Sequence, residues 1–348
     1  SVPEYQFIPG TRRWLAARGY FSFGRYTDGD WSERTVGPNH LYNVGRWLHT
    51  KGLFLRLGDP DRHQFSFEGG LEMGCQFGGT LYATDEHGNK SVKTKFHTGL
   101  KDLIKVVIPL GGGDANDPVQ SGEITNALGN HVGQWSAAVG WRSRDHRWGV
   151  RLYYQHFFDD HSMLFFDHAW RDMLLGLELK FPRNPVVSTF VYEYLITKDQ
   201  SGPVYWDATD KIPEQVSGAD DYYNHYYYGN WQHWGMGMGN PLVISPVYDS
   251  GNTLMFRHNR IKGHHWGWEG NPHPDLHYRV LMSYTRSWGS YFYPTYDVLH
   301  NFNALVELTY APHQLPGWSG KCSFGADGGR LLGRSVGIMF TISKKGWL

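Results

Sequence analysis

The chain has 348 residues, and its 33 Lys and Arg balance 33 Asp and Glu. This balance excludes a whole-molecule electrostatic attraction to nucleic acid or to an acidic membrane surface. Hydrophobic residues make up 40% of the sequence, but no apolar run approaches the ~20 residues of a membrane-spanning helix, so a membrane location would require strands.

The first third of the chain predicts strands over residues 14–26, 45–57, 64–77 and 93–108. The pattern is clearest from 64 to 77, where one parity is apolar and the other is polar, with Phe65, Phe67, Leu71, Met73, Cys75 and Phe77 opposed by Gln64, Ser66, Glu68, Glu72 and Gln76. A strand of this length covers roughly 40 Å, which at a tilt of about 40° crosses the apolar band of a bilayer. Soluble strands are usually about half as long.

The same alternation continues to the end of the chain. It predicts further strands near 134–142, 148–154, 173–181, 186–195, 254–269, 276–284, 302–310, 318–327 and 335–343. Short turns alternate with long connections at 159–169, 197–252 and 288–299, as expected where tight turns lie at the periplasmic rim and long loops lie outside the cell. We predict one all-β domain over residues 1–348, a transmembrane antiparallel up-and-down β-barrel of roughly 14 to 16 strands, with 197–252 as a long extracellular or plug loop.

Composition supports this class without proving it. The chain contains 15 Trp, 22 Tyr, 19 Phe and 43 Gly, a mixture typical of aromatic girdles and crowded, curved sheets. A soluble polysaccharide-binding β-protein would share it. Both cysteines, Cys75 and Cys322, have the apolar parity of their strands, so we expect them to face outward as small hydrophobes. The sequence opens at Ser1 without the pattern of a signal peptide, which we expect to have been removed.

The polar parity should face the barrel interior. It carries charges that need solvation or a partner, and these predicted lumen-facing residues are Glu68, Glu72, Arg151, Glu178, Arg279, Glu307 and Lys321. They can pair across the interior as a rigid ladder, or they can line an open, selective channel.

Motifs for catalysis and cofactors are weak. The run 333–337 matches G-x-S-x-G, but Ser335 begins a strand pattern and lacks the strand-to-helix turn that activates such a serine. The glycines of 235–239 lack the context of a dinucleotide loop. We therefore predict no catalytic residue and no cofactor.

Metal-binding patterns are equally incomplete. His264 and His265 are adjacent, and adjacent strand residues point to opposite faces. Other groupings are His156 with Asp159, Asp160 and His161, and His225 with His233. Asp28 with Asp30, and Asp114 with Asn116 and Asp117, lack the full ligand set of a calcium loop. No metal site is predicted.

The densest feature is the segment 220–234, which reads DDYYNHYYYGNWQHW. Exposed aromatic rings flanked by polar side chains suit a sugar, whereas the same rings could also pack as a plug over or within the barrel. The candidate glycan-binding residues are Tyr222, Tyr223, His225, Tyr226, Tyr227, Tyr228, Trp231 and Trp234, with Arg257, Arg260 and Lys262 available to an anionic polysaccharide.

Several segments resemble the capsule assembly protein Wzi family. They are ALGNH at 127–131, YYQHFF at 153–158, VYEY at 191–194, TKDQSGP at 197–203, DYYN at 221–224, GNPL at 239–242 and YTRSWG at 284–289. The resemblance covers most of the chain from about residue 40 onward. Family members carry more sequence before the first strands, including a helical region not found in this sequence.

The resemblance implies a bacterial outer-membrane barrel of about eighteen strands, which extends the predicted range to 14–18. It also implies a non-catalytic, lectin-like protein that binds or anchors capsular polysaccharide, with membrane lipid and polysaccharide as partners and no nucleic acid. Three alternatives remain open: a porin or selective channel, a barrel component of a larger surface complex with partner proteins, and a barrel-embedded hydrolase suggested only by Ser335 and scattered His and Asp.

Overall fold

The computed structural model describes residues 1–110, 127–159, 171–200, 221–249 and 253–346. Within these ranges the chain forms eighteen strands, all paired antiparallel, with two α-helices and one 3₁₀ turn. The predicted all-β, up-and-down class is confirmed.

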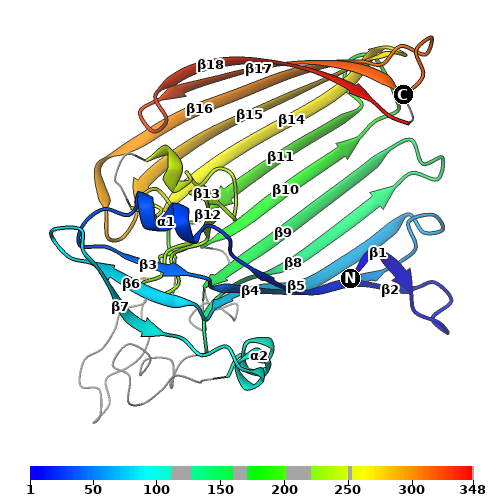
Figure 1. The fold of residues 1–348 in the computed structure, drawn as a ribbon. Helices are drawn as coiled ribbons and strands as arrows, with labels where there is room; N and C mark the ends of the chain where they lie inside the picture. The colour runs from blue at the N-terminus through cyan, green and yellow to red at the C-terminus, as the bar shows by residue number, and fades with distance from the viewer. Residues whose placement is uncertain (111–126, 160–170, 201–220, 250–252, 347–348) are drawn as a thin grey trace.

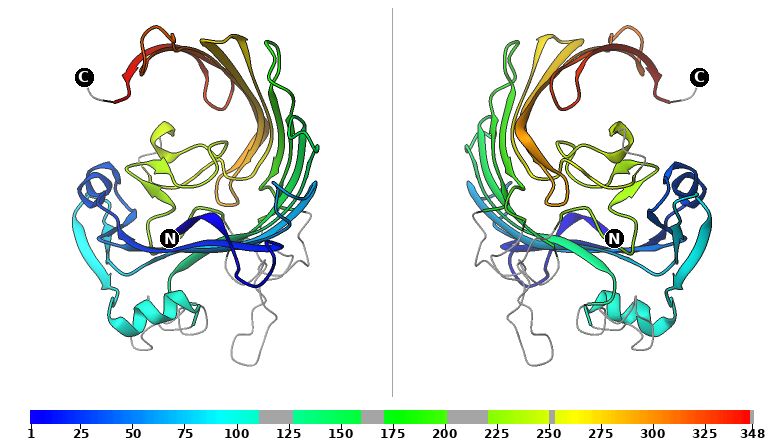
Figure 2. Two further views of the ribbon diagram at one scale, coloured as in Figure 1. Left: turned by 90° about the vertical axis from the view of Figure 1, so that its right-hand side faces the viewer. Right: turned by 90° about the vertical axis from the view of Figure 1, so that its left-hand side faces the viewer.

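Thirteen strands form one large curved sheet that follows the order of the chain (Figure 1). They are β1 (Val2–Phe7), β2 (Leu15–Arg25), β4 (Trp47–Leu57), β5 (Phe65–Phe77), β8 (Asn130–Arg142), β9 (Gly149–Asp159), β10 (Met173–Lys180), β11 (Thr189–Ile196), β14 (Ile261–His273), β15 (Leu276–Gly289), β16 (Pro294–Tyr310), β17 (Trp318–Gly329) and β18 (Arg334–Lys344). Figure 2 shows the sheet wrapping around a concave interior. In the described residues no pairing joins β1 to β18, so these two strands are the edges of the sheet.

The register converts the sequence alternation into two chemically distinct faces. One row of directly opposed residues is apolar across all ten strands from β5 to β18: Phe65, Trp141, Val150, Leu179, Phe190, Trp268, Val280, Val306, Phe324 and Ile338. Phe65, Phe324 and Ile338 are 56%, 49% and 63% exposed. A strip of large apolar side chains facing away from the interior is the exterior expected of a transmembrane barrel.

A row of opposite parity runs across the same strands and is polar or small. It consists of Glu68, Ala138, Tyr153, Gly176, Glu193, His265, Ser283, Asn303, Asp327 and Ser335. This face is the concave one, because its neighbours Glu72 and Gln134 line a hollow with Trp231 of the segment inside the sheet. The sheet therefore has an apolar exterior and a polar interior.

From β2 to β15 the connections are sorted by length between the two ends of the sheet, as predicted, whereas the short β15–β16 and β17–β18 turns lie at the end that otherwise carries the long connections. One end carries short turns such as 58–64, 143–148 and 274–275; we call it the short-turn rim. The other end, the long-loop rim, carries α1 (Gly29–Thr35), β3 (Leu41–Val44), β6 (Thr80–Thr84), β7 (Lys90–Lys95), α2 (Leu100–Val107), β12 (Gln232–His233), β13 (Met236–Gly237) and the 3₁₀ turn η3 (Pro246–Tyr248). Strands β3, β6 and β7 make a separate small sheet, and β12 pairs with β13.

The prediction of a loop over 288–299 is wrong. Strand β15 continues to Gly289 and β16 begins at Pro294. A tight turn replaces the loop, because Gly289 adopts a φ of 78°, a conformation that is easy for glycine, and the Ser290 N–H donates to the Tyr293 carbonyl at 3.2 Å.

The predicted strand over 93–108 is also wrong beyond residue 95, where β7 ends and α2 follows. Leu100, Leu103, Ile104 and Val107 have helical spacing. The helix begins where the Gly99 N–H donates to Asp102 Oδ2 at 2.9 Å, which satisfies one of the unpaired donors of a helix N-terminus.

Helix α2 changes the environment expected for Cys75. Buried Val106 and partly buried Leu103 pack against Cys75 and Phe77 on the outward parity of β5. Cys75 was expected to face outward as a small hydrophobe. It does lie on the outward parity, but α2 covers it and only 1% of it is exposed. Cys75 and Cys322 are both free thiols.

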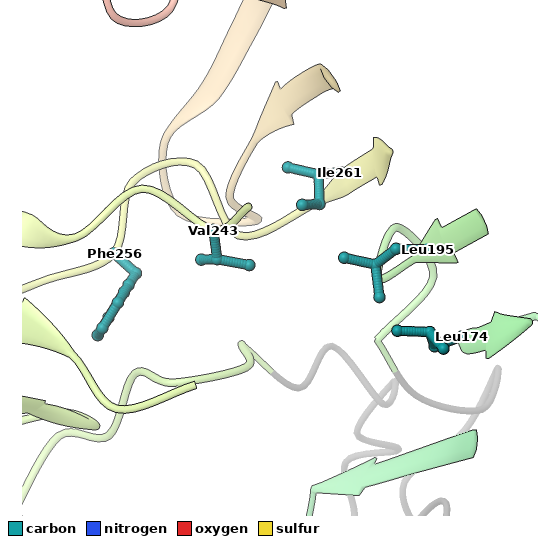
Figure 3. Close-up of a cluster of buried hydrophobic side chains, with 5 residues drawn as sticks. All are labelled: Leu174, Leu195, Val243, Phe256 and Ile261. Atoms are coloured by element: carbon teal, nitrogen blue, oxygen red, sulfur yellow. The ribbon is translucent and has the colours of Figure 1, made fainter. Parts of the chain in front are cut away.

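Residues 221–249 and 253–260 lie on the concave side of the sheet, and we call them the inner segment (Figure 2). The predicted strand region from 254 is wrong here, because β14 begins only at Ile261 and Leu254 is buried against Val36 and Tyr42. Figure 3 shows Val243 and Phe256 in one apolar cluster with Leu174 of β10 and Leu195 of β11. This cluster attaches the inner segment to the sheet.

Candidate functional site

The aromatic residues of the inner segment divide into buried and exposed groups. Tyr228, Trp231 and Tyr222 are 0%, 5% and 6% exposed, whereas Tyr226 and Trp234 are 69% and 53% exposed. Tyr228 packs with Leu81 and Phe96 of the long-loop rim. Most of the aromatic cluster thus packs as a plug, and only its exposed members present ring faces to solvent.

Trp231 approaches the sheet so closely that its partner position requires glycine. A Cβ added to Gly74 of β5 would lie 2.8 Å from the Trp231 ring. Gln76, two residues further along β5 on the same face, donates from Nε2 to the Asn230 carbonyl at 2.8 Å. Gly74 therefore leaves space for the inner segment against the concave face, and Gln76 holds it there by a hydrogen bond.

A buried ion pair fixes the inner segment to the long-loop rim. Arg46 Nη2 lies 3.3 Å from Asp28 Oδ2, and these side chains are 0% and 1% exposed. The same nitrogen donates to the Gln232 carbonyl of β12 at 2.9 Å, and the guanidinium carbon lies 3.9 Å from the centre of the Tyr26 ring. Asp28, which the sequence offered as a calcium ligand with Asp30, is instead the partner of an arginine.

A second buried network joins the two ends of the inner segment. Asn259 Nδ2 donates to Asp221 Oδ1 at 2.5 Å, and Asn224 Nδ2 donates to Asp221 Oδ2 at 2.9 Å. Burial raises the pKa of the Asp221 carboxyl. The two amides pair both carboxylate oxygens of Asp221, which burial would otherwise leave without hydrogen-bond partners.

An open hollow of about 710 Å³ lies beside this network at the long-loop rim. Its lining includes Tyr226, together with Phe292 and Tyr293 from the β15–β16 turn, and these rings are 69%, 69% and 38% exposed. Asn39, His40, Lys93 and His225 supply hydrogen-bonding or charged groups to the same hollow. Phe292 and Tyr293 were not among the predicted site residues, because they are distant in sequence from the aromatic segment 220–234 and were expected in a separate loop.

The predicted lumen-facing charges interact within the concave face. Glu307 accepts from Lys321 Nζ at 3.0 Å and from Arg279 Nε at 2.7 Å. Arg151 lies 3.5 Å from Glu68. The other two acids also have partners: Glu72 accepts from Gln134 Nε2 at 2.8 Å, and Glu178 lies 3.2 Å from Lys180. Six of the seven residues form cross-strand contacts, whereas Glu178 pairs with Lys180 along its own strand, β10.

Water still has room on this face. A hollow of about 610 Å³ is lined by Arg18, Glu68, Glu72, Arg151 and Glu193, beside the first residues of β1. A polar cavity of this size holds many water molecules.

The three predicted cations that follow the aromatic run 220–234 do not form one site. Arg257 lies 3.3 Å from Asp249 and 4.9 Å from the Tyr293 ring, next to the hollow at the long-loop rim. Arg260 stacks 4.1 Å over the Tyr291 ring. Lys262 is directly opposite Arg286 on the outward parity of β14 and β15.

The histidine and serine motifs have structural explanations. His264 contacts Tyr192, Tyr194 and Trp266 on the outward parity, whereas His265 shares a hydrogen bond of 2.8 Å with Ser283 on the concave face. Ser335 Oγ donates to Asp327 Oδ2 at 2.7 Å on the adjacent strand. Among the described residues no group of three potential metal ligands is found. Asp114, Asn116, Asp117, Asp160 and His161 lie outside the described residues.

Comparisons with known proteins give a fold likeness and no family. The chain is similar to the crystal structure of Acinetobacter baumannii OccAB2 with a TM-score of 0.34 and 8% identity, over 94% of this chain and 91% of that one. It is similar to the outer membrane channel DcaP of Acinetobacter baumannii with a TM-score of 0.32 and 8% identity, over 96% and 98%. No family model and no curated protein matches the sequence. These likenesses are too weak to assign a function.

The described part of the chain contains no helix with the length and apolar character needed to cross a membrane. The large antiparallel sheet with its apolar exterior fits the predicted location in a bacterial outer membrane.

Proposed function

We propose that this protein is a non-catalytic outer-membrane barrel that binds surface polysaccharide at the long-loop rim, which faces the outside of the cell. The observation that carries the proposal is the hollow of about 710 Å³ with three exposed aromatic rings, Tyr226, Phe292 and Tyr293. The resemblance of several segments to the capsule assembly protein Wzi family supports the same class of ligand.

The chemistry of the hollow suits a sugar chain. Aromatic ring faces pack against the apolar C–H faces of a sugar, and polar groups at the edge of the hollow can hydrogen-bond its hydroxyls. Two rings come from the β15–β16 turn and one from the inner segment, so the buried networks that hold the inner segment also position the platform. Lys93 and His225 add positive or hydrogen-bonding groups for an anionic glycan.

The concave face favours a second candidate, a selective channel. Its charged residues line a hollow of about 610 Å³ that water could fill. The inner segment, however, occupies the interior through the cluster of Leu174, Leu195, Val243, Phe256 and Ile261 (Figure 3). We therefore place polysaccharide binding first and conduction second.

The test compares polysaccharide binding by purified protein in detergent with that of the variant Tyr226→Ala/Phe292→Ala/Tyr293→Ala. The matched control is Tyr248→Ala/Tyr296→Ala/Phe21→Ala, which removes three exposed rings outside the hollow. Capsule-type polysaccharide should bind the wild type and the control and bind the first variant at least about tenfold more weakly, since each stacked ring contributes about 1 kcal/mol. Equal polysaccharide binding by both variants would show that the hollow is not the binding site. Steady conductance in a planar bilayer without polysaccharide binding would support the channel.

A further inference from the structure

The outward face of β11, β14 and β15 ends at the long-loop rim in a group of cations. Lys262 of β14 is directly opposite Arg286 of β15. Lys198, which follows β11, has its ammonium 5.2 Å from the centre of the Trp288 ring, and the Arg286 guanidinium lies 5.6 Å from the same ring. We call Lys198, Lys262 and Arg286 the rim cations.

The rim cations have no carboxylate partner in the described part of the chain. None of the ion pairs there involves any of the three. Like charges directly opposite on adjacent strands repel each other, so this arrangement costs folding free energy unless an anion lies between them. Nearby Arg260 differs, because its charge acts on the buried Asp221 carboxyl.

Some cations at the opposite end of the sheet do have carboxylate partners. At the short-turn rim Arg13 lies 2.6 Å from Asp59, and Arg142 lies 3.7 Å from Asp61. Others there, such as Lys344, form no ion pair with the described residues, so the distinguishing feature of the rim cations is that Lys262 and Arg286 are directly opposite each other on adjacent strands.

Their position relative to the apolar exterior indicates the ligand. Two residues nearer the middle of the sheet, on the same face, a row of opposed rings crosses β11, β14, β15 and β16, formed by Tyr194, His264, Tyr284 and Phe302. The apolar row of Phe190, Trp268, Val280 and Val306 lies four residues further along. Aromatic girdles lie at the level of lipid headgroups, so the rim cations are at the height of the headgroup phosphates.

We propose that Lys198, Lys262 and Arg286 form a binding site for the phosphate of a lipid headgroup in the outer leaflet. Arginine and lysine make short, charge-assisted hydrogen bonds to phosphate oxygens, and a phosphate between the rim cations removes their mutual repulsion. The acyl chains of the same lipid would pack on the apolar row below. The inference rests on the proposed membrane location, and it assigns Lys262 to lipid in place of polysaccharide.

The experiment measures binding of diphosphoryl lipid A to the full chain in detergent by native mass spectrometry. The variant Lys262→Gln/Arg286→Gln should bind it about tenfold or more weakly at low salt. The control Arg142→Gln/Lys344→Gln, which removes two cations of the short-turn rim, should bind like the wild type. Dephosphorylated lipid A should bind all three proteins equally.

Further measurements distinguish a lipid phosphate from free phosphate and from a polysaccharide as the ligand. Inorganic phosphate should fail to displace the lipid at equal concentration; displacement would identify a site for free phosphate and overturn the proposal. Loss of capsule-type polysaccharide binding by Lys262→Gln/Arg286→Gln, with lipid binding intact, would overturn it in favour of the glycan. Unchanged lipid binding by this variant would also overturn it. Insertion of the wild type into vesicles, followed by heat-modifiable migration, tests the membrane location separately.

Discussion

The Arg46 guanidinium and the Asp28 carboxylate lie 3.3 Å apart with both side chains removed from solvent. This pair joins the region after β2 to the inner segment, because Arg46 also donates to the Gln232 carbonyl of β12 at 2.9 Å. Replacing Arg46 with Ala leaves a buried carboxylate without its cation, which typically costs about 3–5 kcal/mol. Hydrogen exchange in 228–238 should therefore accelerate strongly.

The control for this prediction is Arg34→Ala, which removes an exposed arginine from α1. It should leave exchange in 228–238 unchanged. Equal exchange in the wild type and the Arg46 variant would show that the ion pair does not hold the inner segment.

Glu307 is the centre of the ion-pair network on the concave face. It is 7% exposed and accepts from Arg279, Lys321 and Ser323. The isosteric change Glu307→Gln removes the charge and leaves two cations facing each other, so we expect a loss of about 3 kcal/mol and a lower temperature for heat-modifiable migration. Glu178→Gln, whose partner Lys180 is largely exposed, should change stability by less than about 1 kcal/mol. Similar small effects in both variants would show that the network is not a stabilising ladder.

Tyr228 and Tyr226 should differ in how much their replacement by Ala lowers the stability of the protein. Tyr228 is 0% exposed among Leu81 and Phe96, whereas Tyr226 is 69% exposed. Tyr228→Ala should destabilise the protein by about 3–5 kcal/mol, and Tyr226→Ala should leave stability within about 0.5 kcal/mol. Denaturant unfolding in detergent measures both. A stable Tyr228→Ala variant would contradict the packing of the inner segment.

The buried carboxyl of Asp172 should make the folding stability of the protein depend on pH. It lies just before β10 with its carboxylate accepting the Asp199 N–H at 2.9 Å, and burial raises its pKa from 3.8 to about 6. Between these values the folded state binds the proton more tightly than the unfolded state. The stability contributed by this group is therefore fully present below about pH 4 and is lost as the pH rises through about 6.

The side chain in the variant Asp172→Asn does not titrate, so this variant should lose less folding stability than the wild type between pH 4 and pH 7. The two losses should differ by up to about 3 kcal/mol. Thermal unfolding in detergent across this range measures the difference. Asp85→Asn, at an exposed turn with a lowered carboxyl pKa, should not reduce the loss. Parallel pH profiles for the wild type and Asp172→Asn would contradict the assignment.

The two-faced strands could be predicted from the sequence because successive side chains of a strand point to opposite faces, and the apolar and polar residues alternate with the same period. Phe65, Phe67 and Glu68 alternate in the sequence, and the structure places the rings on the exterior and the acid on the concave face. Helix α2 could not be separated from a strand in the same way. Ile104, Val106 and Ile108 have the alternate spacing of a strand, whereas Leu100, Leu103, Ile104 and Val107 have helical spacing, so the two patterns compete over the same residues.

The candidate site was predictable only in part. The sequence marked 220–234 as the aromatic centre, but composition cannot distinguish a ring that fills a pocket, such as Tyr228, from one that faces solvent, such as Tyr226. Phe292 and Tyr293 join Tyr226 only through the tertiary fold, because the tight β15–β16 turn brings them to the same rim. No local pattern encodes that approach.

The most direct test of the central claim is a nitroxide scan along β16 in lipid vesicles. Single labels would replace Val306 and Leu308, which face outward at 40% and 46% exposure, and Leu305 and Thr309 of the opposite parity, in a background without Cys75 and Cys322. The outward labels should be accessible to oxygen and protected from a water-soluble nickel chelate, and the other two should show the reverse. Equal access of the chelate to all four positions would contradict a sheet that spans the membrane with one face in lipid and the other in water.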